Sequence, residues 1–208
     1  MGQIQVEYNV GGIAGLCVIT PKAYGDKRGY FMETYNAGDM RRTGLSYDFV
    51  QDNQSGSVGG VLRGLHYQIH YPQTKLVRVT RGRVYDVAVD IRQDSKTYGH
   101  YYGVELSEEN RKQFLIPRGF AHGFLVLSEY ADFCYKCDDF YHPDDEGGIA
   151  WNDPALGIVW PGLRGEYPGS ASAKGYYLDS GCPLILSAGQ WKVFNEKRVA
   201  LSAVIWYL

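Results

Sequence analysis

Short runs of apolar and β-branched residues recur along the chain at intervals of about ten residues, separated by glycine, proline and polar turns. In the central block, residues 61–90, the run 62–68 alternates, and the runs 75–81 and 84–91 meet at Gly82 as a hairpin. The same pattern predicts further strands at 16–21, 30–35, 47–55, 99–106, 113–117, 121–127 and 130–138. Only 37–46 and 107–112 show helical character, each for about one turn. Many short strands with few short helices predict an all-β sandwich or barrel.

The spacing of polar residues in the central block is similar to the metal motif of the cupin barrels, G-x5-H-x-H-x3-4-E-x6-G. His66 occupies the first histidine position, but Gln68 replaces the second. Lys75 stands seven residues before Gly82, where the motif has its glutamate. The motif's second half, P-x-G-x2-H, survives as Pro117, Gly119 and His122.

The exchange of a glutamate for Lys75 changes the chemistry of this site. A fixed ammonium repels a divalent cation and supplies no anionic ligand for it. We therefore predict a double-stranded β-helix, the cupin-type jelly-roll barrel, without a metal ion or other cofactor. A metal-dependent cupin oxygenase is the competing reading, and it requires a stoichiometric metal.

Length and composition are those of a globular protein. The chain has 208 residues, 45% hydrophobic and 21% charged, and no linker divides it, which predicts one domain over residues 1–208. A net charge of −2 argues against a nucleic-acid or membrane-surface partner. No signal peptide and no apolar run of the ~20 residues that span a bilayer is present, so we expect a cytoplasmic protein.

Four cysteines raise the question of a metal or redox site. Cys134 and Cys137 form a C-x-x-C motif, but it lies within a predicted strand, where residues i and i+3 point to opposite faces. Two such sulfurs cannot readily chelate one ion or form an unstrained disulfide. We expect buried free thiols here and at Cys17 and Cys182.

Several longer strings resemble the dTDP-4-dehydrorhamnose 3,5-epimerase family between about residues 16 and 161. They are GDKRGYFMETYN, FVQDNQS, GVLRGLHYQ, KLVRV, VYDVAVD, GVELSEENRKQFLIPRGFAHGFLVLS and GGIAWNDPALGIVWP. The resemblance implies a metal-free cupin barrel, usually a homodimer. It also implies proton exchange at C3 and C5 of dTDP-4-dehydro-6-deoxy-D-glucose, which gives dTDP-4-dehydro-L-rhamnose in dTDP-rhamnose biosynthesis.

Such chemistry needs a base, an acid on the opposite face of the sugar and a positive group at the enolate oxygen. The resemblance implies that His66 is the base, and an imidazole titrates near neutrality. It implies Tyr135 as the acid. Lys75 would meet the oxyanion, where a preorganised donor is worth roughly 3–4 kcal/mol. The alternatives are a core histidine, a core tyrosine and a surface lysine.

The resemblance also implies the substrate-binding residues. Arg28 and Arg63 would bind phosphate, for which a guanidinium offers bidentate hydrogen bonds. Tyr141 would stack on thymine, with Phe140 as a competitor. The other implied contacts are Glu33, Gln51, Asp52, Asn53, His122 at the sugar, and Glu146.

Two points concern side-chain orientation in this set. In the alternation of the predicted strand 84–91, Asp86 occupies an inward-facing position, and we expect it to orient one of the two imidazoles. Regular alternation would place Arg63 and His66 on opposite faces. Either the strand is irregular near Gly64, or one of the two acts across a dimer.

The chain departs from the family near its C-terminus. A Ser-x-Lys-Asp string, whose aspartate pairs with the catalytic histidine, is replaced by a stretch containing Gly189 and Gln190, which starts an atypical segment from about residue 187. Asp179 is a candidate replacement for the missing aspartate. A reading-frame change near Ala188 is a hypothesis that would explain the altered segment. The chain could therefore be a 3,5-epimerase, a 3- or 5-mono-epimerase, or a catalytically impaired nucleotide-sugar-binding homologue.

Overall fold

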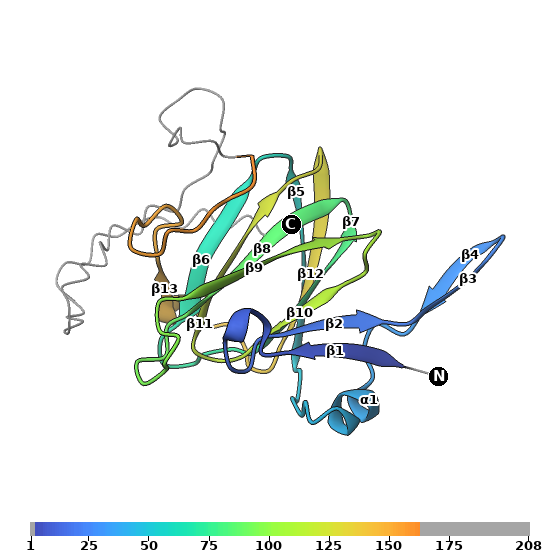
Figure 1. Cartoon of the computed structure of the whole chain (residues 1–208), viewed down its shortest axis with the longest axis horizontal. Coiled ribbons are helices and arrows are strands. Elements are labelled where there is room, and N and C mark those ends of the chain that lie inside the picture. The colour runs from blue at the N-terminus through green and yellow to red at the C-terminus, as the bar shows by residue number, and fades with distance from the viewer. Residues whose placement is uncertain (1–2, 163–208) are drawn as a thin grey trace.

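Two antiparallel sheets stack face to face in the computed structural model, which describes residues 3–162 (Figure 1). The six-stranded sheet has, in spatial order, β1 (Ile4–Tyr8), β2 (Cys17–Pro21), β10 (Gln113–Ile116), β7 (Lys75–Arg81), β12 (Tyr130–Cys137) and β5 (Gln51–Val58). The five-stranded sheet has β13 (Glu146–Gly148), β6 (Leu62–Gln68), β11 (Phe120–Val126), β8 (Arg83–Asp90) and β9 (Tyr101–Ser107). Apart from the consecutive pairs β1–β2 and β8–β9, neighbouring strands are not consecutive in sequence, as expected for a jelly roll.

Alternation along the strands sends one set of side chains between the two sheets, where they form the main core. Val77, Phe114 and Phe133 from the six-stranded sheet meet Val84 and Phe124 from the other. The rings of Phe124 and Phe133 stack with centroids 4.2 Å apart. Burying each such side chain contributes roughly 1.5–3 kcal/mol, so this layer fixes the spacing between the sheets.

Both outer faces are also covered. Leu65, Val87 and Leu125 point out of the five-stranded sheet and pack with Ile149 and Trp160 from the segment after β13. On the six-stranded sheet, a second outer cluster contains Cys17, Ile19, Met40, Leu45, Leu76 and Leu115. Met40 belongs to α1 (Ala37–Arg42), which Asn36 caps by accepting from the N–H groups of Gly38 and Asp39.

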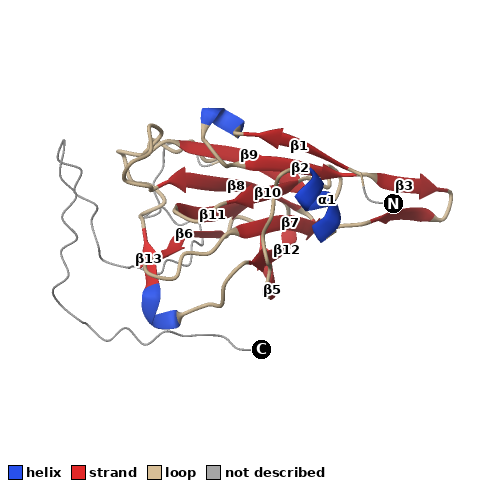
Figure 2. Ribbon diagram, turned by 90° about the horizontal axis from the view of Figure 1, so that it is seen from below, coloured by secondary structure: helices blue, strands red, loops and turns tan. Residues whose placement is uncertain are grey.

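A third, two-stranded sheet extends away from the barrel. It consists of β3 (Ala23–Asp26) and β4 (Gly29–Met32). In both ribbon views this hairpin projects from the end of the molecule opposite β13 (Figures 1 and 2). Its aromatic side chains Tyr24, Tyr30 and Phe31 are exposed. Two single-turn 3₁₀ helices, η1 (Val10–Gly12) and η2 (Pro143–Asp145), complete the described elements.

Most of the predicted strands are confirmed, and the bounds of 62–68 and 75–81 agree fully. The predicted hairpin at Gly82 is wrong, because β7 pairs with β10 and β12 whereas the next strand, β8, belongs to the other sheet. The predicted strand 47–55 is wrong in its position, because β5 runs from Gln51 to Val58. β1, β3 and β13 were not predicted. β13 is a short polar edge strand without apolar alternation, whereas β1 (Ile-Gln-Val-Glu-Tyr) alternates regularly and was missed. Residues 107–112 contain no helix: Ser107 ends β9, and residues 108–110 form a turn.

The described cysteines agree with the expectation of free thiols, but only Cys17 and Cys137 are buried, whereas Cys134 is partly exposed. Cys17, Cys134 and Cys137 are free. Cys137 is buried on the inner face of β12, whereas the Cys134 sulfur lies 3.7 Å from the Thr80 hydroxyl on the other face. Cys182 lies outside the described residues. Among residues 3–162, no helix has the length and apolar character needed to cross a membrane.

Candidate active site

Six of the residues singled out from the sequence are brought to the inner face of the barrel. From the five-stranded sheet come residues of β6, β8 and β11, and from the six-stranded sheet come residues of β7 and β12. They are Arg63, His66, Asp86, His122, Lys75 and Tyr135. Because the two groups are carried by opposite sheets, a ligand between the sheets would meet them from opposite sides.

The register of β6 against β11 explains how Arg63 and His66 share one face. His66 lies opposite His122, and Arg63 lies opposite Phe124, so three steps on β6 correspond to two on β11. This irregularity, at Gly64, turns both side chains inward. The first of the two sequence-based alternatives is therefore confirmed.

Asp86 holds one imidazole in place. Both of its carboxylate oxygens lie 3.0 Å from Nε2 of His122, and both residues are buried. Asp86 and His122 come from the adjacent strands β8 and β11. The buried carboxylate thus fixes the ring orientation and directs the Nε2 proton toward itself. The His66 ring, in contrast, forms no hydrogen bond or ion pair with the described residues.

Lys75 begins β7 and lies directly across from Cys137 on β12. Its side chain lines a pocket at this end of the barrel together with Gln68, Phe120 and His122. Burial lowers the pKa of Lys75, and the acidic groups of Cys137, Glu146 and Asp86 oppose that effect. Within residues 3–162 the ammonium of Lys75 has no hydrogen bond or ion pair, which leaves its donors available to a ligand.

The protonation states of the two proposed proton-transfer groups suit their expected roles. Burial lowers the pKa of His66 below 6.5, with Lys75 and His122 acting in the same direction, so the ring is neutral at pH 7. Burial raises the pKa of Tyr135 above 10, so the phenol keeps its proton. One group is ready to accept a proton and the other is ready to donate one.

A hydrogen-bonded set of residues joins the two sheets at the mouth of the site. The Tyr141 hydroxyl donates to Glu146 Oε2 at 3.0 Å, and its backbone N–H donates to Gln51 Oε1 at 3.0 Å. Gln51 in turn donates to Asn53 Oδ1 at 3.0 Å, and Asn53 lies opposite Tyr135. Four expected binding residues are therefore linked at the edges of β5 and β13.

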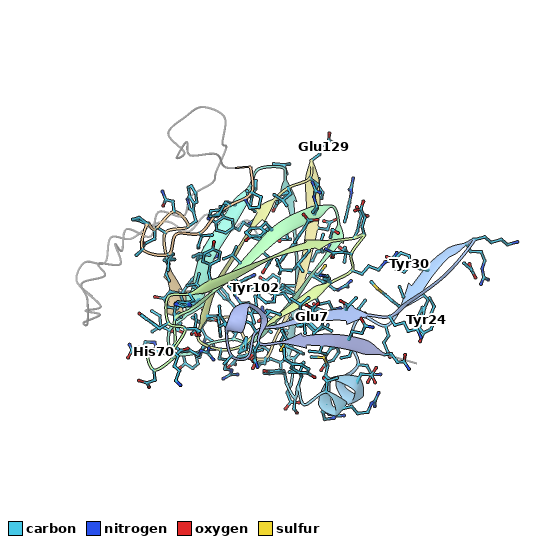
Figure 3. All side chains as sticks on the ribbon, in the orientation of Figure 1. Glu7, Tyr24, Tyr30, His70, Tyr102 and Glu129 are labelled. Carbon is cyan, nitrogen blue, oxygen red and sulfur yellow. The ribbon has the colours of Figure 1, made fainter. Side chains whose placement is uncertain are left out.

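Three expected binding residues, Arg28, Asp52 and Glu33, lie outside this site in the described structure. Arg28 is in the β3–β4 turn, its side chain 84% exposed and paired with Asp26 at 2.6 Å. Figure 3 shows Tyr24 and Tyr30 on the same hairpin, away from the barrel. Within one chain, Arg28 does not reach the site.

Asp52 and Glu33 lie on the outer side of the six-stranded sheet. Asp52 alternates with its neighbours Gln51 and Asn53 and pairs with Lys136 at 2.6 Å. Glu33 accepts from the Asn36 amide at 2.9 Å, next to α1. The expectation that the whole run 51–53 lines one site is corrected by this alternation.

The sequence reasoning assigned no site role to Cys137. This thiol is fully buried, 3.9 Å from the Asn53 amide nitrogen, and burial raises its pKa to about 11. The signal was available, because Cys137 follows Tyr135 by two positions on a strand and so shares its face. Asp179, Gly189 and Gln190 lie outside the described residues.

The described part of the chain contains no group of three or more His, Cys, Asp or Glu side chains arranged to hold a metal ion. His66 and His122, the two residues at histidine positions of the metal motif, have Lys75 beside them. The expectation of a metal-free and cofactor-free site stays a prediction.

Comparison with known proteins agrees with this geometry. The sequence profile of the dTDP-4-dehydrorhamnose 3,5-epimerases matches residues 11–179. The chain belongs to the dTDP-4-dehydrorhamnose 3,5-epimerase family. It is 57% identical over 147 residues to the enzyme of that name from Methanothermobacter thermautotrophicus, covering 71% of this chain and 80% of the relative.

Solved structures of the family share the fold. A dTDP-6-deoxy-D-glucose-3,5-epimerase from Legionella pneumophila in complex with dTDP-4-keto-L-rhamnose is 52% identical, with a TM-score of 0.73 and coverage of 76% of this chain and 84% of that one. A 3'-monoepimerase from Streptomyces bikiniensis in complex with dTDP-quinovose is 32% identical, with a TM-score of 0.68 and coverage of 72% and 77%. The cupin-type jelly roll predicted from the sequence is therefore confirmed.

Proposed function

We propose that this protein epimerises dTDP-4-dehydro-6-deoxy-D-glucose at C3 and C5 to dTDP-4-dehydro-L-rhamnose. One observation carries the proposal: His66 and Tyr135 enter the same space from opposite sheets, the first as a neutral base and the second as a protonated phenol. Inversion of a carbon requires removal of a proton from one face and its return to the other. Two walls with opposite proton-transfer groups supply that arrangement.

The reaction begins when His66 takes the proton from the carbon next to the ketone. The C–H electron pair becomes a C=C bond, and the carbonyl oxygen becomes an enolate. Lys75, whose donors are available in the described structure, stabilises that oxyanion. The negative charge in turn favours the ammonium form of the lysine. Tyr135 then donates its proton to the opposite face of the carbon, and the ketone re-forms.

The binding residues divide between the two ends of the substrate. Arg63 lies on the inner face beside both His66 and Tyr135, where its guanidinium suits the diphosphate. Tyr141, at the mouth, has an exposed ring that suits the thymine. Phe140 is more exposed, at 61% against 46%, and has no comparable link to Gln51 and Glu146. We therefore favour Tyr141 for the stacking role.

Solvent exchange tests the proposed activity. The protein is incubated with the 4-keto sugar nucleotide in D₂O, and deuterium at each carbon is followed by NMR. Deuterium at both C3 and C5, with formation of the L-rhamno product, is the expected result. Deuterium at one carbon would make it a mono-epimerase like its Streptomyces relative. Binding without any exchange would reduce it to a nucleotide-sugar-binding homologue.

We also propose that the active form is a homodimer in which Arg28 serves the partner's site. The support is that Arg28 is remote from His66 in its own chain and lies on a projecting hairpin with three exposed aromatic side chains. Mixing inactive Arg28→Ala with inactive Lys75→Met chains, followed by refolding, would give mixed dimers with one intact site. Recovery of about a quarter of the activity per chain is expected for random pairing, and no recovery would contradict the exchange.

The free thiols of Cys17, Cys134 and Cys137 support the cytoplasm as the proposed location.

A further inference from the structure

The charges around His66 are unevenly distributed. Four groups act on its ring: Glu146 from β13, Lys75 from β7, His122 from β11 and Arg63 from its own strand β6. Lys75, His122 and Arg63 all oppose protonation of the ring, and among the described residues only Glu146 favours it. The carboxylate of Asp86 is bound to His122 and does not offset this imbalance.

The position of Glu146 follows from strand pairing. β13 pairs with β6 so that Gly148 lies opposite His66 and Glu146 lies opposite Gln68. Residues two apart on a strand share a face with each other and with their cross-strand partners. Glu146 therefore projects from the same face as His66, on the neighbouring edge strand.

The carboxylate is also tethered. Tyr141 donates its hydroxyl proton to Glu146 Oε2 at 3.0 Å, while the Tyr141 backbone is held by Gln51 across the mouth. A side chain on an edge strand would otherwise sample several rotamers. The tether thus keeps one negative charge on the side of His66.

We propose that Glu146 is a positioning residue for proton transfer, which supports the imidazolium of His66 in a chain whose late segment lacks the family's Lys-Asp pair. This inference rests on the proposed function. When His66 takes the proton from carbon, its ring becomes positive beside Lys75, His122 and Arg63, which all oppose its protonation, and the carboxylate of Glu146 lowers the energy of that state. Tyr141 both holds Glu146 and is the proposed stacking partner of thymine. Nucleotide binding and proton transfer are therefore coupled through the Tyr141–Glu146 hydrogen bond.

The full-length protein with four single substitutions tests the inference. The pKa of the His66 ring is measured by NMR in the parent and in Glu146→Gln, Glu146→Asp, Tyr141→Phe and Asp144→Asn. Glu146→Gln is expected to lower this pKa, Tyr141→Phe to lower it less, and Glu146→Asp to keep most of the parent value. Asp144→Asn is the matched control, since it removes an exposed carboxylate two residues away that does not act on His66.

Kinetics provide the second readout. Glu146→Gln should reduce kcat on the order of tenfold and move the acid limb of the pH profile to lower pH. The loss is smaller than the about 10⁴-fold effect of an orienting aspartate, because Glu146 is exposed and acts without a hydrogen bond to the ring. An unchanged His66 pKa in Glu146→Gln, or a change in KM alone, would overturn the inference. If the parent shows no epimerase activity, the NMR titration still decides whether Glu146 acts on His66.

Discussion

His66 and His122 lie directly opposite each other on β6 and β11, yet only the His122 ring is hydrogen-bonded to a carboxylate in the described part of the chain. The two imidazoles therefore differ in chemistry despite their equivalent positions. His122 is fixed by Asp86, whereas His66 is held neutral by burial and by neighbouring cations. A fixed ring suits binding of the sugar, and a neutral ring suits proton abstraction.

Replacing Asp86 by Ala should destabilise the protein by about 1.5–3 kcal/mol, because it leaves the buried His122 ring without its charged partner. Urea denaturation at pH 7 measures this free energy of unfolding. Asp52→Ala is the control, since its ion pair with Lys136 is exposed and should contribute about 1 kcal/mol or less. Equal losses in the two variants would contradict the structural importance of the Asp86–His122 pair.

Replacing Lys75 by Met should reduce kcat by about 10²- to 10³-fold, as expected for loss of a preorganised oxyanion donor. Binding of dTDP, measured by calorimetry, should change little, because the lost contact is to the enolate. Lys136→Met is the matched control on the outer face of the sheet and should keep near-parental turnover. A Lys75→Met variant with parental kcat would remove the lysine from the mechanism.

Stability should fall in mild acid in a way that depends on His66. Its folded-state pKa lies below the unfolded value of 6.5, so the unfolded chain binds the proton first as the pH falls. The ring's contribution is complete above pH 6.5 and is lost as the pH falls through the folded pKa. His66→Asn should flatten this part of the stability curve, measured by urea denaturation between pH 8 and 5. Parallel curves for the two proteins would show that His66 does not contribute.

Much of this fold was predictable because its central strands alternate strongly. Leu62–Gln68 and Lys75–Arg81 carry both the periodicity and the spacing that placed His66 and Lys75 in one site. The edge strand β13 was missed because Glu-Gly-Gly has no apolar alternation, and it is recognised only by its pairing with β6. The proximity of Glu146 to His66 therefore depends on the tertiary structure and is not visible in the local sequence.

Side-chain direction was the other limit of the sequence. The run 51–53 was expected to act as a unit, but strand alternation turns Asp52 outward. Arg63 and His66 share a face only because β6 gains a residue relative to β11, and nothing in the local sequence fixes the position of such a bulge except Gly64. Arg28 lies far from the site because the β3–β4 hairpin that carries it projects away from the barrel.

Gly64 is the residue on which this bulge depends. Its φ is +126°, and a Cβ there would lie 2.5 Å from Gly123 Cα and 2.8 Å from the His122 carbonyl oxygen. Gly64→Ala should therefore cost about 3 kcal/mol or more and reduce activity, because β6 and β11 must separate where His66 faces His122. Gly60→Ala is the matched control: its φ is also positive, at +78°, but nothing lies within 4 Å of the added Cβ. Its cost should be about 1 kcal/mol with activity retained. Similar urea midpoints and turnover for the two variants would show that close approach of the strands at Gly64 does not set the site.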